Sequence, residues 1–410
     1  MKINKYFPFA FIYFFVNSLA LPFGLTYTAI LSPLFYWWVI TRRKKEILLP
    51  FFVCLSPFFI IHFMLTVDTR TYIVSVLNYT AVYIFCQAFY TFLKLSGNPE
   101  KPFKKLLVLN FILCLVAIPV YVTSYYGFLW MPRTIINGVA NISRLKLFTY
   151  EASYYAALFT PLFFFYLLQL LLHQNKINSW LLLPMLFLPY MLSLSIGVIG
   201  SILFAIVLTW FMYFKIFTRK KRVLTLLVVT CGLSAIVFIA LLIFYPQNGI
   251  FLRIADIYSG NDTSGKGRTY EAFMLAQQIL EQKSLVWGVG PGQIKILGAD
   301  IIRSYYLYAL DYNTIAIPNA AAETLAIFGW AGLLLRIFIE LFLFFYTRVW
   351  TNYYRLLLFL FIFLYQFTGS FITNIAEYVI WILAFTNVFP AFDVRQKNPE
   401  YNNAYQNTMR

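Results

Sequence analysis

The chain has 410 residues, of which 61% are hydrophobic and only 11% are charged, and its mean hydropathy is +0.74. Soluble domains have about 45–50% apolar residues, so this composition excludes an ordinary soluble globule. The formal net charge of +17 would suggest a nucleic-acid partner in a soluble protein, but here the basic residues fall in short clusters between apolar runs. The sequence therefore predicts an all-α polytopic integral membrane protein that contacts membrane lipids and binds no nucleic acid.

Apolar runs long enough to cross a bilayer of about 30 Å recur along the whole chain. We expect about twelve transmembrane helices, near residues 6–23, 25–41, 47–67, 71–94, 106–126, 153–173, 179–196, 198–217, 223–245, 319–346, 352–371 and 373–390. They form a single polytopic membrane domain, residues 1–410. The alternative for the first run is a secretory signal peptide that is cleaved after Ala20. Without this run, however, the other runs would no longer place most of the basic residues on the cytoplasmic side.

The Lys and Arg residues are distributed unequally between the two sides of this predicted bundle. Of the 32, 21 lie in the termini and in alternate connections, ten lie on the opposite side, and Arg336 lies within a run. The positive-inside rule therefore predicts that both termini are cytoplasmic. The four cysteines all lie inside apolar runs without Cys-x-x-Cys spacing, which is typical of packing residues and argues against a metal site or a disulfide framework.

Two segments interrupt the bundle on the external side, near residues 127–152 and 246–318. The second is too long for a passive connector. Within it, the stretch from Arg268 to Lys283 is predicted to be an amphipathic helix, because apolar residues recur at 272, 275, 276, 279 and 280. Just before this helix, Gly260–Gly267 nearly matches a phosphate-binding loop, but Gly267 replaces the required hydroxyl residue, so we expect no nucleotide there.

The most specific pattern consists of several short motifs in a fixed order. They are Arg144 followed by Glu151-Ala152-Ser153, then Gly267-Arg268-Thr269-Tyr270, Trp287–Gly292, Pro318–Glu323 and Gly329-Trp330-Ala331-Gly332. In this order, with a large external loop followed by a helix, they resemble the bacterial O-antigen polymerase and O-antigen ligase superfamily (Wzy and WaaL). Each motif alone is weak, and the order of all of them together is the signal.

One departure separates the two branches of that superfamily. The ligase pattern has a His directly before the position of Asn319, and this chain has Pro318 there, although Gly329 and Gly332 fit. His173 lies at a predicted cytoplasmic helix end, and we expect His62 to be a polar packing residue. The resemblance therefore favours the polymerase.

The resemblance implies a GT-C-like glycosyltransferase of lipopolysaccharide biosynthesis in the bacterial inner membrane, with its active site facing the periplasm. Such an O-antigen polymerase moves a growing undecaprenyl-pyrophosphate-linked glycan onto the non-reducing end of a new undecaprenyl-pyrophosphate-linked repeat unit. Its expected partners are this donor, this acceptor and a chain-length regulator protein. No cofactor and no metal is expected.

The reaction needs positive charge for the leaving pyrophosphate and a group that accepts the proton of the acceptor hydroxyl. Arginine binds phosphate oxygens bidentately and keeps its charge. We therefore expect Arg144 and Arg268 to bind the pyrophosphate, with Lys266, Arg253 and Arg303 as further candidates.

Carboxylates near the outer membrane face are the candidate bases, namely Glu151, Glu323 and Glu377, with Asp68 as a further candidate. A buried ion pair with an arginine is the alternative role for these side chains. By contrast Arg336 and Glu340, spaced i, i+4, are expected to neutralise each other.

Tyr154, Tyr305 and Asn319 are the candidate glycan-binding residues, and interfacial belt tyrosines are the alternative interpretation of the two rings. Two other functions stay open: an O-antigen ligase, and a lipid-linked oligosaccharide flippase or other secondary transporter. A transporter predicts repeated halves with interrupted helices and ionisable residues near mid-membrane. We find no such internal symmetry in the sequence. A nucleotide-sugar transferase is disfavoured because no Asp-x-Asp motif occurs.

Overall fold

The computed structural model describes residues 7–18, 21, 25–96, 99–131, 135–136, 139–140, 143–172, 177–213, 266–306 and 315–394. Its α-helices are α1 (Phe7–Phe15), α2 (Tyr27–Ile30), α3 (Ser32–Arg43), α4 (Leu48–Met64), α5 (Thr69–Leu95), α6 (Glu100–Val120), α7 (Ala152–Leu171), α8 (Ser179–Ser193), α9 (Ile196–Met212), α14 (Tyr270–Leu280), α15 (Ile294–Leu297), α16 (Ala299–Tyr306), α17 (Ala320–Tyr346), α18 (Tyr353–Tyr365) and α19 (Ile375–Phe385). Short 3-10 helices are η1 (Tyr126–Phe128), η3 (Val349–Thr351) and η4 (Pro390–Phe392). The described strands are β1 (Ile135–Ile136) and β2 (Val139–Ala140), which pair antiparallel.

The helices α5, α6, α7 and α17 are long and apolar enough to cross a membrane, and α4, α8, α9, α18 and α19 are shorter apolar helices. The chain is thus an all-α protein with several long apolar helices, as a polytopic membrane protein requires. The predicted number of twelve spans stays a prediction. The span expected at 223–245, the end of the span at 198–217 and parts of both external segments lie outside the described residues.

Two predicted spans differ from continuous helices. The run at 25–41 is divided into α2 and α3 at Leu31. The run at 319–346 is helical throughout except at Gly329, where φ is 66° and ψ is −169°, so that α17 consists of two helical parts joined by a kink. The expected amphipathic helix is confirmed as α14, and the five apolar residues of its predicted face are its buried residues.

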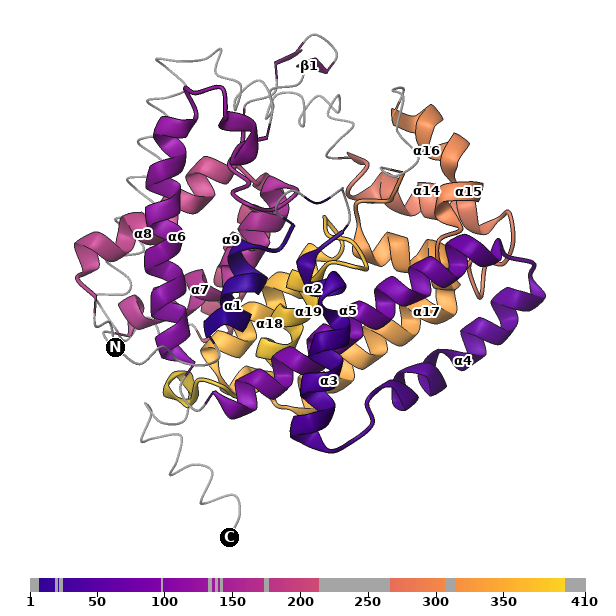
Figure 1. Cartoon of the computed structure of the whole chain (residues 1–410), viewed down its shortest axis with the longest axis horizontal. Helices are drawn as coiled ribbons and strands as arrows, with labels where there is room; N and C mark the ends of the chain where they lie inside the picture. Colours follow the sequence, from indigo (N-terminus) through magenta and orange to yellow (C-terminus); the bar gives the residue numbers. More distant parts are fainter. Residues whose placement is uncertain are drawn as a thin grey trace.

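Figure 1 shows α6, α7, α8 and α9 on one side of the bundle and α4, α5 and α17 on the other, with α18 and α19 between them. The hairpin β1–β2 and the helices α14, α15 and α16 lie at the upper end of the bundle in this view. The connection between α3 and α4, which follows the basic stretch Arg42–Lys45, lies at the lower end. The two segments predicted to be external therefore share one end of the molecule.

The main hydrophobic core surrounds α7. Almost every side chain of α7 is buried, which is the pattern of a helix enclosed on all sides, and it packs against α8, α9, α18 and α19. A second, smaller core lies under α14, where its apolar face packs against the first half of α17. This second core holds α14 against the bundle.

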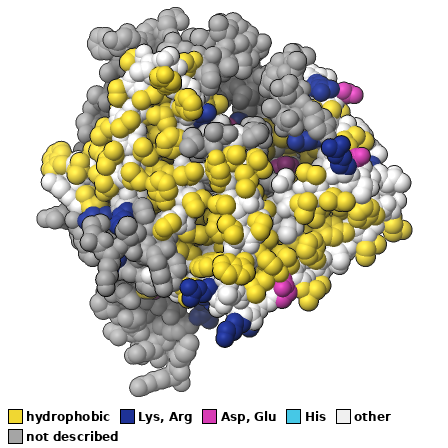
Figure 2. Space-filling view, viewed as in Figure 1, with side chains coloured by type: hydrophobic (Ala, Val, Ile, Leu, Met, Phe, Trp, Pro, Cys, Tyr) yellow, Lys and Arg dark blue, Asp and Glu magenta, His cyan; other side chains and the backbone are white. Residues whose placement is uncertain are grey.

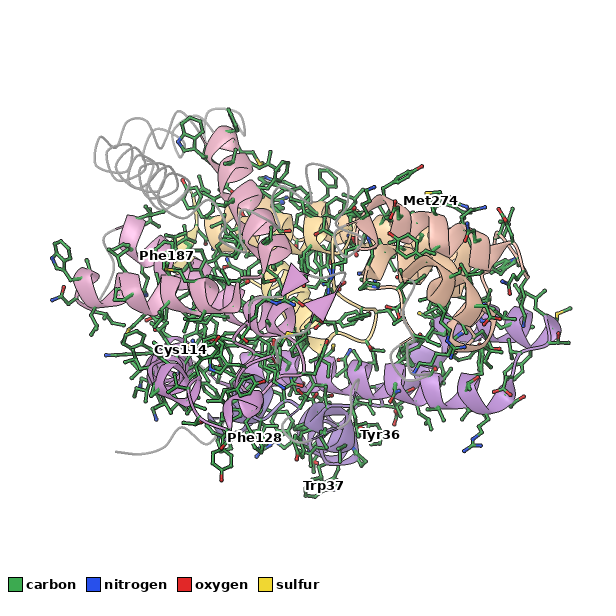
Figure 3. All side chains as sticks on the ribbon, turned by 90° about the horizontal axis from the view of Figure 1, so that it is seen from above. Tyr36, Trp37, Cys114, Phe128, Phe187 and Met274 are labelled. Atoms are coloured by element: carbon green, nitrogen blue, oxygen red, sulfur yellow. The ribbon has the colours of Figure 1, made fainter. Side chains whose placement is uncertain are left out.

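The outer surface of the bundle is largely apolar. In Figure 2 hydrophobic side chains cover a broad band across the visible face, and most Lys, Arg, Asp and Glu side chains lie at its margins. Figure 3 shows Trp37, Phe128, Phe187 and Met274 at the periphery, and all four are exposed. An exposed apolar band of this extent is unfavourable in water and is what a lipid-facing surface requires.

Candidate functional site

Two of the glycine-containing motifs lie against each other and form one structural unit. The stretch 285–290 runs beside the kink of α17 and forms backbone hydrogen bonds on both sides of it. These bonds join Val289 N–H to the Ala326 carbonyl and Gly290 N–H to the Ile327 carbonyl, both at 3.0 Å, Trp330 N–H to the Leu285 carbonyl at 3.1 Å, and Ala331 N–H to the Val286 carbonyl at 3.0 Å. The non-helical backbone at the kink is therefore hydrogen-bonded, as it must be near a membrane.

Glycine is required at the two closest points of this unit. A Cβ atom on Gly288 would lie 2.3 Å from the Ile327 carbonyl oxygen, and one on Gly329 would lie 2.2 Å from the Val286 carbonyl oxygen. Both residues also have positive φ, at 78° and 66°. These glycines explain why the two motifs occur together, and they determine the shape of the site beside them.

A cavity of about 280 Å³ lies next to this unit. Its walls come from α5, from the stretch that leads into α15, from the first half of α17 and from the connection between α18 and α19. The polar residues Ser75, Asn78, Thr373 and Asn374 line it, together with tyrosines. A concave site that combines polar groups with aromatic rings suits a hydroxylated ligand such as a saccharide.

Glu323 is the carboxylate of this cavity. It lies in the first turn of α17, and the Ile372 N–H donates to its Oε2 at 2.7 Å. Among the residues that the structure describes, no hydrogen bond engages its Oε1. The carboxylate is thus fixed by one oxygen while the side chain lines a cavity, which is the arrangement that a general base needs.

Lys295 lines the same cavity and was not predicted from the sequence. Burial lowers the pKa of its half-buried ammonium group, and the Glu323 carboxylate opposes this effect. The available signal was its position three residues after Gly292, the last glycine of the Trp287–Gly292 motif.

The structure brings Glu151 and Arg268 together, 117 positions apart in the chain. The Arg268 guanidinium donates to Glu151 Oε1 at 2.9 Å. Burial raises the pKa of Glu151, but the charge of Arg268, hydrogen bonds from Ser153 and Arg268, and the charge of Arg144 outweigh it, so the pKa lies below its usual range. Arg144, Glu151 and Arg268, which come from two of the predicted motifs, therefore form one electrostatic group.

This group is adjacent to the cavity through two tyrosines whose rings are tilted by 37° to each other. The rings of Tyr150 and Tyr154 have centroids 4.7 Å apart, and both residues line the cavity. The Tyr154 hydroxyl accepts a hydrogen bond from the Asn17 amide at 2.8 Å. Tyr154, a predicted glycan-binding residue, therefore presents a ring to the cavity while its hydroxyl is anchored in the bundle.

The other two predicted glycan-binding residues have structural contacts. Asn319 is fully buried, and its side-chain oxygen Oδ1 caps α17 by accepting a hydrogen bond from the Ala322 N–H. Its side-chain Nδ2 donates to the Arg268 and Phe367 carbonyl oxygens at 2.8 and 2.7 Å. Tyr305 on α16 donates a hydrogen bond to Glu271 on α14. Neither residue lines the cavity, so their predicted role in glycan binding gains no support from the geometry.

The remaining predicted cations lie apart from the cavity lining. Lys266 is exposed just before α14, and Arg303 is exposed on α16 and lies 3.8 Å from Asp300. Arg253 lies outside the described residues, as do residues 260–265 of the stretch that resembles a phosphate-binding loop.

Glu377 lies in a buried ionic cluster within the bundle. One of its oxygens pairs with the Arg336 guanidinium, and the other accepts a hydrogen bond from the Ser370 hydroxyl at 2.6 Å. Arg336 also contacts Glu340 at 3.2 Å, as its i, i+4 spacing predicted. Glu377 is only 1% exposed. This is the buried ion pair that the sequence left open as the alternative role, and both oxygens of Glu377 are engaged.

His62 is fully buried and packs as predicted. Its two ring nitrogens lie 3.1 Å from the Tyr72 hydroxyl and 2.7 Å from the Trp287 carbonyl oxygen. Within the described ranges no group of three His, Cys, Asp or Glu side chains is arranged to hold a metal ion. Metal independence stays a prediction.

Comparison of the chain with protein-family models, with curated proteins and with solved structures finds no match. The motif resemblance is therefore a hypothesis, and the cavity with Glu323 and the neighbouring Arg268–Glu151 pair are the observations on which a functional proposal depends.

Proposed function

We propose that this protein is a membrane glycosyltransferase of the O-antigen polymerase type, which transfers a growing undecaprenyl-pyrophosphate-linked glycan onto the non-reducing end of a new lipid-linked repeat unit. The main support for this proposal is the polar, tyrosine-lined cavity, in which the Ile372 N–H holds the Glu323 carboxylate by a hydrogen bond. The reaction is inferred from the motif resemblance, and the cavity is the proposed site of that reaction.

In this proposal Glu323 accepts the proton of the acceptor hydroxyl as that oxygen attacks the anomeric carbon of the donor glycan. The bond between the anomeric carbon and the pyrophosphate oxygen breaks, and its electron pair goes to the pyrophosphate. The leaving group is already activated, so proton transfer and charge stabilisation are the contributions required of the protein. Tyr150 and Tyr154, which line the cavity, stack on the sugar rings.

Arg268 and Arg144 stabilise the pyrophosphate in this scheme. Glu151 orients the Arg268 guanidinium by an ion pair, and a planar guanidinium suits the geometry of phosphate oxygens. Because the pair is partly exposed, with side-chain exposures of 30% and 13%, a phosphate can approach it without leaving a charge unpaired in the interior.

The sidedness of the cavity supports a periplasmic reaction in the bacterial inner membrane. The helices α14, α15 and α16, whose sequence is predicted to be external, lie at one end of the bundle, and the basic connection after α3 lies at the other. Lys295 of α15 lines the cavity, so the cavity lies near the predicted external end.

A lipid-linked oligosaccharide flippase or other transporter is the second candidate, because two features favour it. The interruption of α17 at Gly329 and the buried cluster of Arg336, Glu340 and Glu377 are features that secondary transporters share. We prefer the polymerase because Glu377 and Glu340 are held by several hydrogen bonds, whereas the carboxylate that lines the polar cavity is Glu323.

The test is reconstitution of the purified protein with lipid-linked repeat units. A ladder of lengthened undecaprenyl-pyrophosphate products, formed without nucleotide and unaffected by a chelator, is the expected result. Loss of the protein from its host should leave the lipid A core capped with a single repeat unit, since flipping and ligation continue. A core without any repeat unit would support the ligase or the flippase instead.

A further inference from the structure

We propose that Lys295 is a further catalytic residue, whose ammonium group contacts the pyrophosphate of the donor inside the cavity. This inference rests on the proposed function, and it assigns a cation to the cavity itself. The predicted arginine Arg268 is paired with Glu151 beside the cavity, whereas Lys295 and Glu323 are the charged side chains among the described residues that line it.

Lys295 is held in place by contacts between its helix and the start of α5. The Gln293 amide donates to the Asp68 carbonyl and to the Thr71 hydroxyl, both at 3.2 Å, and the Asp68 N–H donates to Gln293 Oε1 at 3.0 Å. A Cβ atom on Gly292 would lie 2.5 Å from the Thr71 carbonyl oxygen, so the chain approaches α5 as closely as it can. The lysine therefore projects from a fixed backbone, which reduces the reorganisation needed to bind a charged group.

The charge balance of the cavity changes in the direction that the reaction requires. The Glu323 carboxylate attracts the ammonium group of Lys295. When Glu323 accepts the proton of the acceptor hydroxyl it becomes neutral, and this attraction is lost. In the same step the bond to the donor pyrophosphate breaks and its electron pair increases the negative charge on that group. The ammonium group of Lys295 then stabilises the negative charge that the leaving group develops.

The first experiment measures binding and requires no turnover. The purified protein in detergent is titrated calorimetrically with geranyl pyrophosphate, with inorganic pyrophosphate and with uncharged geraniol. We expect the Lys295→Gln variant to bind both pyrophosphates at least about tenfold more weakly, as for loss of a charge-assisted contact, and to bind geraniol like the wild type. Lys295→Arg should recover most of the affinity.

Lys283→Gln is the matched control, because Lys283 lies at the same end of the molecule, outside the cavity lining, and donates to the Thr66 carbonyl. This variant should bind pyrophosphate like the wild type. Thermal unfolding of each variant establishes that the Lys295 variants are folded. Equal pyrophosphate affinity in the wild type and a folded Lys295→Gln variant, or equal losses for Lys295→Gln and Lys283→Gln, would overturn the inference.

A second experiment separates this inference from the proposed function. If the wild type forms a ladder of glycan products and pyrophosphate binding does not depend on Lys295, the inference fails and the polymerase proposal stands. If binding depends on Lys295 and no ladder forms, the anion site stands and the polymerase proposal fails. With both in place, Lys295→Gln should lower kcat, and Lys295→Arg should restore it in part.

Discussion

Glu323 and Glu377 occupy similar positions in the sequence and opposite environments in the structure. Each lies in the first turn of a helix that begins after an asparagine cap, at Asn319 and Asn374. Glu323 has one oxygen bound by the Ile372 N–H and lines a polar cavity. Both oxygens of Glu377 are engaged, by Arg336 and by Ser370, and the side chain is 1% exposed.

This comparison shows that the environment of a carboxylate at a helix start depends on its partners from other parts of the fold and not on the local sequence. Arg336 lies in the second half of α17, beyond the kink, and from there it reaches Glu377 on α19 and Glu340 on its own helix. Glu323, on the first half of α17, lines the cavity instead. One carboxylate belongs to a buried ionic cluster, and the other lines a polar cavity.

The largest expected effect on stability is at the buried cluster. Replacing Glu377 by Ala removes the carboxylate that pairs with the Arg336 guanidinium, and breaking such a buried pair costs about 3–5 kcal/mol. Thermal unfolding in detergent should therefore show a marked loss of stability and lower protein abundance. Glu281→Gln is the control, since Glu281 is exposed at the end of α14 and its change should have little effect. Equal stability of the two variants would contradict a structural role for Glu377.

The next effect is expected where the glycine motifs meet. Gly329→Ala introduces a Cβ atom 2.2 Å from the Val286 carbonyl oxygen in a conformation that only glycine adopts readily, so we expect a loss of at least about 2 kcal/mol. Gly200→Ala in α9 is the matched change, because no atom lies within 4 Å of the added Cβ. It should be neutral or slightly stabilising. If both variants unfold at the same temperature, the close contact of the two motifs is wrong.

A smaller effect is expected at the pair of Glu151 and Arg268. The pKa of Glu151 is depressed in the folded protein, so the pair stabilises the fold fully above the unfolded value of about 4.3 and less as the pH falls through the folded pKa. For a partly exposed pair we expect about 1 kcal/mol. The difference in unfolding temperature between wild type and Arg268→Ala should therefore stay constant from pH 7 to about 5 and shrink as the pH falls from about 5 to about 3. A difference independent of pH would show that the pair contributes nothing through its charge.

Periodicity and charge were sufficient to predict the long apolar helices and the buried face of α14, because these depend on residues close together in the chain. The kink of α17 was not predictable in this way. Gly329 stands in an apolar run that reads as one helix, and the break is stabilised by the backbone of residues 285–290. A contact that forms only in the folded protein leaves no periodic signal.

The candidate site was predicted in part. Glu323 and Tyr154 line the cavity as their positions near the outer face suggested, and Arg268 meets Glu151, both of which were named separately. Lys295 was missed because it lies on a four-residue helix with no periodicity of its own. A buried ion pair was left open as the alternative role of Glu377, but Arg336 was not identified as the partner, because the i, i+4 spacing of Arg336 and Glu340 accounted for that arginine locally.

The most direct measurement is the rate of glycan lengthening by purified Glu323→Gln, compared with the wild type and with Glu281→Gln. The amide can still accept the Ile372 hydrogen bond but cannot take up a proton, so a general base at this position predicts a rate lower by roughly 10²–10⁴-fold with unchanged thermal stability. Glu281→Gln should retain the wild-type rate. A Glu323→Gln variant that lengthens glycans at the wild-type rate would contradict the assignment of this cavity as the site of transfer.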